Sequence, residues 1–189
     1  MDRITIVQHD NIALVAPELV DYELMCLNRN DYKATQFLDL DDFGGTVCPR
    51  LRDEKTWTET ISKHGHFMCI YKIDTDEIVG TITLHSTSER NRRADLGIII
   101  FSKHWNQGIG TQATRLMLQY AFELQGFHKI GLSVWADNIG GIRCYEKCGF
   151  KYVGIHKEHF WNYDHYVDMV DMEILVSEYK ELKEEWFTL

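Results

Sequence analysis

The chain contains 189 residues, of which 44% are hydrophobic and 26% charged, the balance of an ordinary globular protein, and this favours a single domain over residues 1–189. The formal net charge of −9 disfavours nucleic acid and anionic membranes as partners and favours cationic ones such as amines. No apolar run reaches the ~18 residues that a membrane-spanning helix needs, so we expect no membrane partner.

The N-terminal third has the least regular pattern. Ile12–Val15 is a short aliphatic run, which predicts a strand. Pro17–Arg29 has apolar residues at helical spacing and a proline near its start, which predicts a helix. Residues 30–50 are polar and acidic, so we expect a short helix and a loop. Helical spacing returns over Arg52–Lys63, where we expect Trp57 in the core.

The hydrophobic period changes to two in the central region. The segments 66–73, 78–84 and 94–101 read as strands, and short polar connections separate them. Together they predict a three-stranded antiparallel meander over residues 66–101.

Helices and strands alternate in the second half. A long amphipathic helix is expected after Thr111 and extends to about Leu124, with Gly126 as its C-cap. The further elements are strands at His128–Trp135, Lys151–Phe160 and Tyr166–Val176, a helix from Asn138 to Gly149, and a short polar helix at the C-terminus. The sum is an α/β fold of the α+β kind, built on a central sheet.

The loop Trp105–Thr111 lies between the meander and the long helix. Gly108 and Gly110 lack side chains, so backbone N–H groups can approach a ligand closely. The free amides of the first helical turn and the helix dipole favour an anion there. Because the loop carries no lysine or arginine, we predict that backbone amides hold a pyrophosphate.

Taken alone, Gly-x-Gly is equally typical of a tight turn between a strand and a helix. A P-loop NTPase is disfavoured, because no Gly-Lys-Ser/Thr follows. A Rossmann site has Gly-x-Gly-x-x-Gly. Ala113 is a tolerated variant of its last position, but an antiparallel meander is not the βαβ unit with which that site begins.

A second motif covers residues 138–150, Asn-Ile-Gly-Gly-Ile-Arg-Cys-Tyr-Glu-Lys-Cys-Gly-Phe. It resembles the pattern Asn-x-x-Ala/Ser-Ile-x-x-Tyr-x-Lys-x-Gly-Phe of the GCN5-related N-acetyltransferase (GNAT) superfamily. Gly141 replaces the usual Ala or Ser, a change that leaves room for a cofactor. The matching positions are Asn138, Ile142, Tyr145, Lys147, Gly149 and Phe150.

The glycine loop resembles the Gln/Arg-x-x-Gly-x-Gly/Ala loop of the same family. Trp105 stands at the Gln/Arg position, as in the ribosomal-protein and spermidine acetyltransferase branches, and the run from Arg92 to Ile100 looks most like the spermidine branch. The resemblance covers roughly residues 66–176. It implies a GNAT fold, with a mixed, mostly antiparallel, splayed sheet of about six to seven strands flanked by helices.

The resemblance also implies acetyl-CoA as co-substrate. The strand residues Ile98, Ile99 and Ile100 would offer backbone groups to the pantetheine arm and one amide to the oxyanion. Gly97 suits the bulge at which this strand leaves its neighbour. The pyrophosphate would lie on Trp105, Asn106, Gln107, Gly108, Ile109, Gly110 and Thr111.

The helix of the second motif supplies further expected contacts. Asn138 would contact the cofactor arm, and Tyr145 would be the general acid that protonates the departing thiolate. Arg143 and Lys147 would reach phosphates, although solvation at the surface is an equal alternative for both. For Tyr145 the alternative is packing alone.

The general base is less well defined. Asp95 stands where the spermidine branch carries a glutamate, so we name it as the candidate. The alternative is that Asp95 orders the turn or pairs with Arg92 or Arg93.

The acceptor has two candidates, a small cationic, polyamine-like amine and a protein N-terminus. Glu158, Asp164 and the acidic run Asp39–Asp42 would attract a cation, and Trp161 would line the acceptor mouth. A non-catalytic acyl-CoA-binding sensor is a third possibility. A homodimer or higher homo-oligomer fits the family, whereas the sequence leaves open whether an allosteric polyamine site exists.

The five cysteines include no CxxC pair, which fits free thiols in a reducing cytoplasm. Cys144 and Cys148 share a helix face, and we expect both as core filler. His156 and His159 would face opposite sides of a strand, so we expect no metal site.

Overall fold

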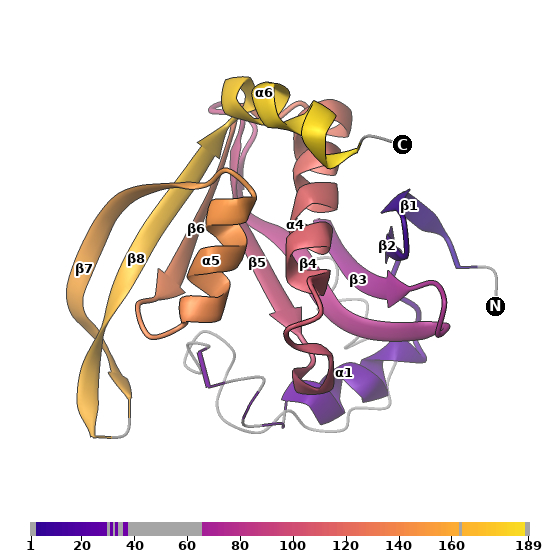
Figure 1. Ribbon diagram of the computed structural model, residues 1–189, viewed down its shortest axis with the longest axis horizontal. Coiled ribbons are helices and arrows are strands. Elements are labelled where there is room, and N and C mark those ends of the chain that lie inside the picture. The colour runs from indigo at the N-terminus through magenta and orange to yellow at the C-terminus, as the bar shows by residue number, and fades with distance from the viewer. Residues whose placement is uncertain are drawn as a thin grey trace.

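An eight-stranded sheet organises the chain, as the computed structural model shows for residues 3–29, 31, 33, 36–37, 66–162 and 164–187 (Figure 1). The strand order is β1-β2-β3-β4-β5-β6-β8-β7. Every neighbouring pair is antiparallel except β5 and β6, which are parallel. The strands are β1 Thr5–His9, β2 Ile12–Val15, β3 His66–Lys72, β4 Glu77–Ser88, β5 Arg93–Ile100, β6 Lys129–Trp135, β7 Lys151–Asn162 and β8 His165–Leu175.

The predicted mixed, mostly antiparallel sheet is therefore confirmed, with one strand more than expected. The additional strand is β1, which forms a hairpin with β2 at one edge of the sheet. The meander β3–β4–β5 is also confirmed. Gly80 of β4 lies so close to β5 that a Cβ atom built on it would be 2.3 Å from the Ile99 carbonyl oxygen.

Three helices cover one face of the sheet, namely α4 Ile109–Gln119, α5 Ile139–Lys147 and α6 Val176–Trp186 (Figure 1). Their apolar residues join those of the strands in the larger core cluster. The long helix ends at Leu124 as predicted, but its last turn, Tyr120–Leu124, is π-helical. Gly126 follows with a φ of 69°, which fits its expected capping role.

Helix α1, Asp21–Arg29, supplies residues to a smaller core on the other face, against β2 and β3. It begins at Asp21 and not at the predicted start, Pro17. The Asp21 carboxylate binds the chain that precedes the helix. This carboxylate is 2% exposed, accepts two hydrogen bonds of 2.8 Å from Arg3, and accepts a third from the Glu18 amide. Residues 17–20 accordingly form a connection before the helix, which is exposed at Leu19 and Val20.

The hairpin of β7 and β8 forms the other end of the sheet. Its register shifts between Tyr152 and Gly154 and again between His156 and Phe160, and Glu158 has a φ of 50°. The expectation that His156 and His159 face opposite sides is therefore wrong. The irregular backbone brings the two imidazole rings to 5.3 Å between centroids.

Several predictions lie outside the described residues. These are the helix over Arg52–Lys63 with Trp57 and the acidic run Asp39–Asp42. Among the helices that the structure does describe, none is both long and apolar enough to cross a membrane.

Candidate functional site

The two parallel strands at the centre of the sheet separate after three residue pairs. β5 and β6 pair at Arg93 with Lys129, at Ala94 with Ile130, and at Asp95 with Gly131. Beyond these pairs β5 follows β4 while β6 follows β8, and the two ribbons diverge in Figure 1. We call this separation, between residues 96–100 of β5 and 132–135 of β6, the fork.

The fork confirms the predicted splay but corrects its cause. Gly97 pairs in register with Thr83, and the β4–β5 ladder is irregular only between His85 and Ser88. Gly97 is therefore not at a bulge in that ladder. Residues Ile98 to Ile100 keep their pairing with β4, and on the side of β6 their edge pairs with none of the described strands.

The predicted pyrophosphate loop leads from the end of β5 into α4. Asn106 and Gly108 have positive φ angles of 61° and 76°, and these turn the chain into the helix. Gly108 is the N-cap residue and provides no side-chain cap. The first amides of α4 have no preceding carbonyl to bond, so Ile109, Gly110 and Thr111 present N–H groups that an anion can accept.

Trp105 connects the loop to the strand. Its indole Nε1 donates a 2.7 Å hydrogen bond to the Ile100 carbonyl oxygen. Its one polar atom is therefore used inside the protein, where it fixes the loop to the edge of the fork. Gln107 makes a similar local contact of 3.3 Å with the Lys103 carbonyl.

Asn138 begins α5 and caps it. Its Oδ1 accepts a 2.8 Å hydrogen bond from the Gly141 amide. A Cβ atom at Gly141 would lie 2.8 Å from Asn138 Nδ2. The space that we expected to serve a cofactor is thus filled by the Asn138 side chain, which explains the glycine locally.

Tyr145 lies on the buried side of α5. Its ring packs edge-to-face on Phe150 at 5.9 Å, and its phenol forms no hydrogen bond with any described residue. Burial, with smaller contributions from the Cys144 and Cys148 charges, raises the pKa of Tyr145 above its usual value. The phenol therefore stays protonated at neutral pH, as a proton donor must.

Asp95 occupies the last residue pair before the fork opens. Its Oδ1 lies 2.8 Å from the position of a Cβ on Gly131, so the carboxylate extends over that glycine. By strand alternation it points away from Ala94 and Leu96, which belong to the face covered by α4 and α5. It forms no hydrogen bond or ion pair with the described residues, and Arg92 instead donates to the Gly126 carbonyl. The structure thus does not show the alternative in which Asp95 pairs with Arg92 or Arg93.

Arg143 and Lys147 are exposed on α5, one turn apart on the same side. The lysine lies close enough to Cys144 to affect that thiol electrostatically. Cys148 is buried as expected, but Cys144 is only partly buried and accepts a 3.5 Å hydrogen bond from the Thr111 hydroxyl. One signal for this contact is visible in the motif, namely a cysteine at a position that the family pattern leaves open.

Aromatic and acidic residues meet at the tip of the β7–β8 hairpin, on the side where the fork opens (Figure 1). Trp135 of β6 stacks on Phe160 at 5.0 Å, and the exposed Trp161 packs on Tyr166. Asp164 is 2.7 Å from His165 Nδ1, whereas the Glu158 side chain is exposed. The described residues contain no group of three His, Cys, Asp or Glu that could hold a metal.

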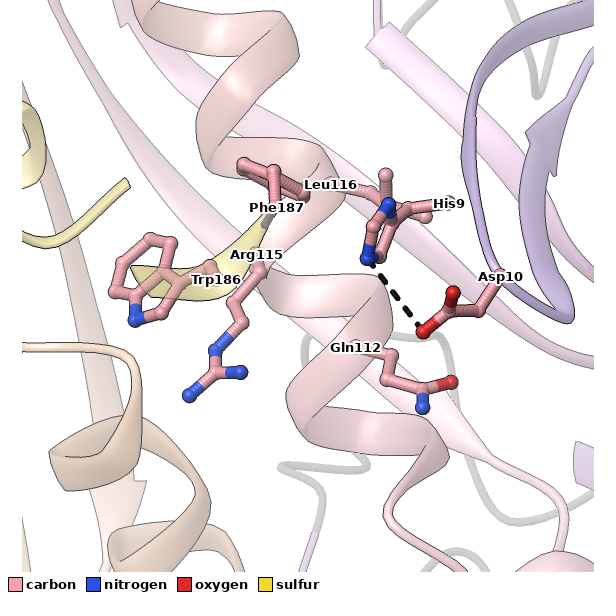
Figure 2. Close-up of a pocket in the computed structure, with 7 residues that line it drawn as sticks. All are labelled: His9, Asp10, Gln112, Arg115, Leu116, Trp186 and Phe187. Atoms are coloured by element: carbon pink, nitrogen blue, oxygen red, sulfur yellow. Dashed lines mark ion pairs between the residues drawn. The ribbon is translucent and has the colours of Figure 1, made fainter. Parts of the chain in front are cut away.

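A separate hollow lies beside the first turns of α4 (Figure 2). It is lined by His9, Asp10, Gln112, Arg115, Leu116, Trp186 and Phe187. Figure 2 shows the Arg115 guanidinium near Trp186, with 5.0 Å between Arg115 Cζ and the ring centroid. None of the predicted site residues lines this hollow.

The splayed sheet and the glycine loop at the start of α4 fit the fold that the sequence resemblance implies, and comparison with known proteins agrees. Residues 11–151 match the family described as the acetyltransferase (GNAT) domain. The chain therefore belongs to the GNAT family.

Curated relatives are N-acetyltransferases. Uncharacterized N-acetyltransferase YoaA of Bacillus subtilis is 31% identical over 99 residues, which are 52% of this chain and 56% of YoaA. Spermidine N(1)-acetyltransferase of Vibrio cholerae is 32% identical over 102 residues, 54% of this chain and 59% of the relative. The chain thus spans little more than half the length of these two relatives.

Solved structures share the fold over most of the chain. Spermidine N-acetyltransferase from Vibrio cholerae, in complex with CoA and spermine, has a TM-score of 0.75 at 24% identity and covers 91% of this chain and 99% of its own. A GNAT-family acetyltransferase from Bacillus anthracis has a TM-score of 0.74 at 20% identity. The match covers 90% of this chain and 98% of that one.

Proposed function

We propose that the chain is an acetyl-CoA-dependent N-acetyltransferase that acts in the cytoplasm on a primary amine of a small cationic, polyamine-like molecule. The observation that carries this proposal is the fork. It leaves an unpaired strand edge inside the sheet, with the glycine loop and Tyr145 towards one face and Asp95 towards the other. Such a site receives two reactants from opposite sides.

The described residues fit the cofactor. Gly108 has open space within 4 Å of a built Cβ, and the first-turn amides of α4 have no helical acceptor. These groups would hold the pyrophosphate, and the free edge at Ile98–Ile100 would contact the pantetheine arm. Acetyl-CoA, when bound, supplies the acetyl thioester.

Tyr145 and Asp95 would divide the proton transfers. Asp95 would take a proton from the amine, directly or through water, so that the nitrogen lone pair can attack the thioester carbon. Tyr145 would donate its proton to the thiolate as the carbon–sulfur bond breaks. The buried, protonated phenol and the unpaired carboxylate suit these two roles.

A cationic acceptor is supported by the charges on the open side. The chain has a formal net charge of −9, and the hairpin tip combines the exposed Glu158 and Asp164 with aromatic rings. Ammonium groups bind to such combinations through ion pairs and cation–π contacts. The spermidine acetyltransferase relatives favour the same class of acceptor.

We also propose that the protein forms a homodimer or higher homo-oligomer. β7 is the outermost strand of the sheet, and its Tyr152, Val153 and Ile155 are exposed. A free strand edge with apolar side chains is suited to pairing with another chain. Size-exclusion chromatography with light scattering measures the molar mass in solution. A mass equal to that of the monomer would contradict the proposed homo-oligomer.

The decisive experiment is an amine panel with acetyl-CoA, read by release of free CoA thiol and by mass spectrometry of the product. We expect turnover with spermidine, spermine or related amines. Turnover only with a Ser- or Ala-starting peptide would identify an N-terminal acetyltransferase instead. Binding of acetyl-CoA without turnover of any amine would support the sensor interpretation.

A further inference from the structure

A cluster of cysteines and threonines lies between α5 and the first turns of α4. The Thr111 hydroxyl donates to Cys144 Sγ at 3.5 Å. A Cβ atom on Gly110 would lie 3.4 Å from the same sulfur. Cys144 is therefore in contact with the loop proposed to hold the pyrophosphate, although the proposed reaction does not use it.

A second observation comes from Thr114, one turn further along α4. Its side chain is 0% exposed, and its hydroxyl oxygen has no hydrogen-bond partner at bonding geometry. This hydroxyl is one of the groups that lower the pKa of Cys144. Thr111 thus donates to the Cys144 sulfur, and the buried Thr114 hydroxyl lies near it, an arrangement that apolar core packing does not require.

Cys144 differs from the other described cysteines in its access to solvent. Cys26, Cys69 and Cys148 are at most 1% exposed, whereas Cys144 is only partly buried. Cys144 is therefore the most accessible of the four described cysteine residues.

The groups that face Cys144 favour its thiolate. The Cys148 thiol contributes most, followed by the hydroxyls of Thr111 and Thr114 and the Lys147 charge, and together they lower the pKa of Cys144 to about 7 against the opposing effect of burial. The positive end of the α4 dipole acts in the same direction. The environment that suits a pyrophosphate also suits a thiolate.

We propose that Cys144 is a reversible modification site, at which a small disulfide forms a mixed disulfide and thereby blocks the pyrophosphate loop. The Cys144 thiolate attacks one sulfur of the disulfide R–S–S–R. A new bond joins Cys144 to one half, the original S–S bond breaks, and the other half leaves as a thiolate that takes a proton from water. The added group then competes for the space next to Gly110.

The inference rests on the proposed function for its consequence, but the reactivity of Cys144 can be measured separately. The experiment uses a Cys48→Ser background, because Cys48 lies outside the described residues. The probe is 2,2′-dithiodipyridine, whose released thione is followed by absorbance, and peptide mass mapping locates the adduct. Binding of acetyl-CoA, which has no free thiol, is measured by calorimetry before and after modification.

We expect Cys144 to react at least about tenfold faster than the buried cysteines, with a rate that levels off above about pH 7 rather than pH 8.5. Saturating acetyl-CoA should slow the reaction at least about tenfold, and modification should weaken acetyl-CoA binding by a similar factor, reversibly with dithiothreitol. Cys144→Ser should lose the fast reaction and keep its affinity within about twofold. Cys26→Ala is the control, because Cys26 is buried and does not affect the pKa of Cys144, and it should keep the fast thiol.

Two results overturn the inference. One is a Cys144 that reacts no faster than the buried cysteines, and the other is a modified protein with unchanged affinity for acetyl-CoA. If the unmodified protein binds no acetyl-CoA, the proposed function fails on that measurement and the blocking role fails with it, while the kinetics still decide whether Cys144 is a reactive thiol.

Discussion

The strands of the β3–β5 meander are paired over a longer stretch than the two strands that meet at the fork. β3 and β4 share seven residue pairs, and so do β4 and β5, whereas β5 and β6 share three. The β2–β4 region has core residues on both faces, α1 lying on one and α4 on the other. The hairpin half instead exposes nearly the whole of β7.

This difference separates stability from function. The longer ladders of the β3–β5 meander stabilise the fold and leave few polar groups free. The interrupted ladder at the fork leaves backbone groups without partners, and the predicted site residues gather around it.

The largest effect is expected at the fork itself. Tyr145→Phe keeps the ring that packs on Phe150 and removes only the proposed acid, so kcat should fall by about a hundredfold or more. Steady-state kinetics with the best amine of the panel measure the loss, and acetyl-CoA affinity should not change. Tyr152→Phe, on exposed β7, is the control. An unchanged kcat in Tyr145→Phe would remove the acid role.

The next largest effect concerns the stability of the N-terminal half. Arg3→Met leaves the Asp21 carboxylate buried without its guanidinium partner, which should reduce the free energy of unfolding by about 3 kcal/mol. Urea denaturation measures this change. Lys183→Met, which removes an exposed partner of Glu123, should have little effect. An equal fall in the free energy of unfolding in both variants would contradict the argument that the burial of Asp21 makes its ion pair the more important one.

Two strand glycines on either side of β5 give a matched pair. Gly80→Ala would place a methyl group 2.3 Å from a backbone oxygen, which should cost about 1–3 kcal/mol of stability. Gly131→Ala meets the end of the Asp95 side chain, which can turn away. We expect this variant to unfold at nearly the wild-type urea concentration but to lose activity, because Asp95 moves. If Gly131→Ala lost stability and Gly80→Ala did not, the close contact that limits stability would lie at the fork instead.

The smallest effects are expected from two histidines whose pKa values are shifted in opposite directions. Burial lowers the pKa of His66 in β3, so its contribution to stability is present above about pH 6.5 and is lost as the pH falls through the lower folded value. Asp164 and Asp137 raise the pKa of His165 in the hairpin, so its contribution is present below about pH 6.5 and is lost as the pH rises.

Melting temperatures between pH 5.5 and 8 separate these two contributions. His66→Gln should reduce the loss of stability on acidification, and His165→Gln should increase it. If both variants changed the dependence of melting temperature on pH in the same direction, neither histidine pKa shift would govern stability between pH 5.5 and 8.

The sequence predicted the meander, the glycine loop and the α5 motif because each is a local pattern of spacing or glycine placement. It missed β1, whose residues alternate weakly and gain strand structure by pairing with β2. It placed the start of α1 at Pro17, because the contact of Asp21 with Arg3 joins residues far apart in the chain. The same limit hid the contact of Cys144 with Thr111 and the proximity of His156 to His159.

The fork also gives the sheet a third edge, one that lies in its interior. Strand edges at the periphery of a sheet invite association with other chains, but this one is enclosed by β6 and by helices on the covered face. Its donors and acceptors belong to the main chain, so substitution of a side chain leaves them in place. Side chains on the proposed acceptor side can therefore be replaced while the interior edge persists, so under the proposed function the amine specificity and the main-chain contacts to the cofactor would be set by separate parts of the site.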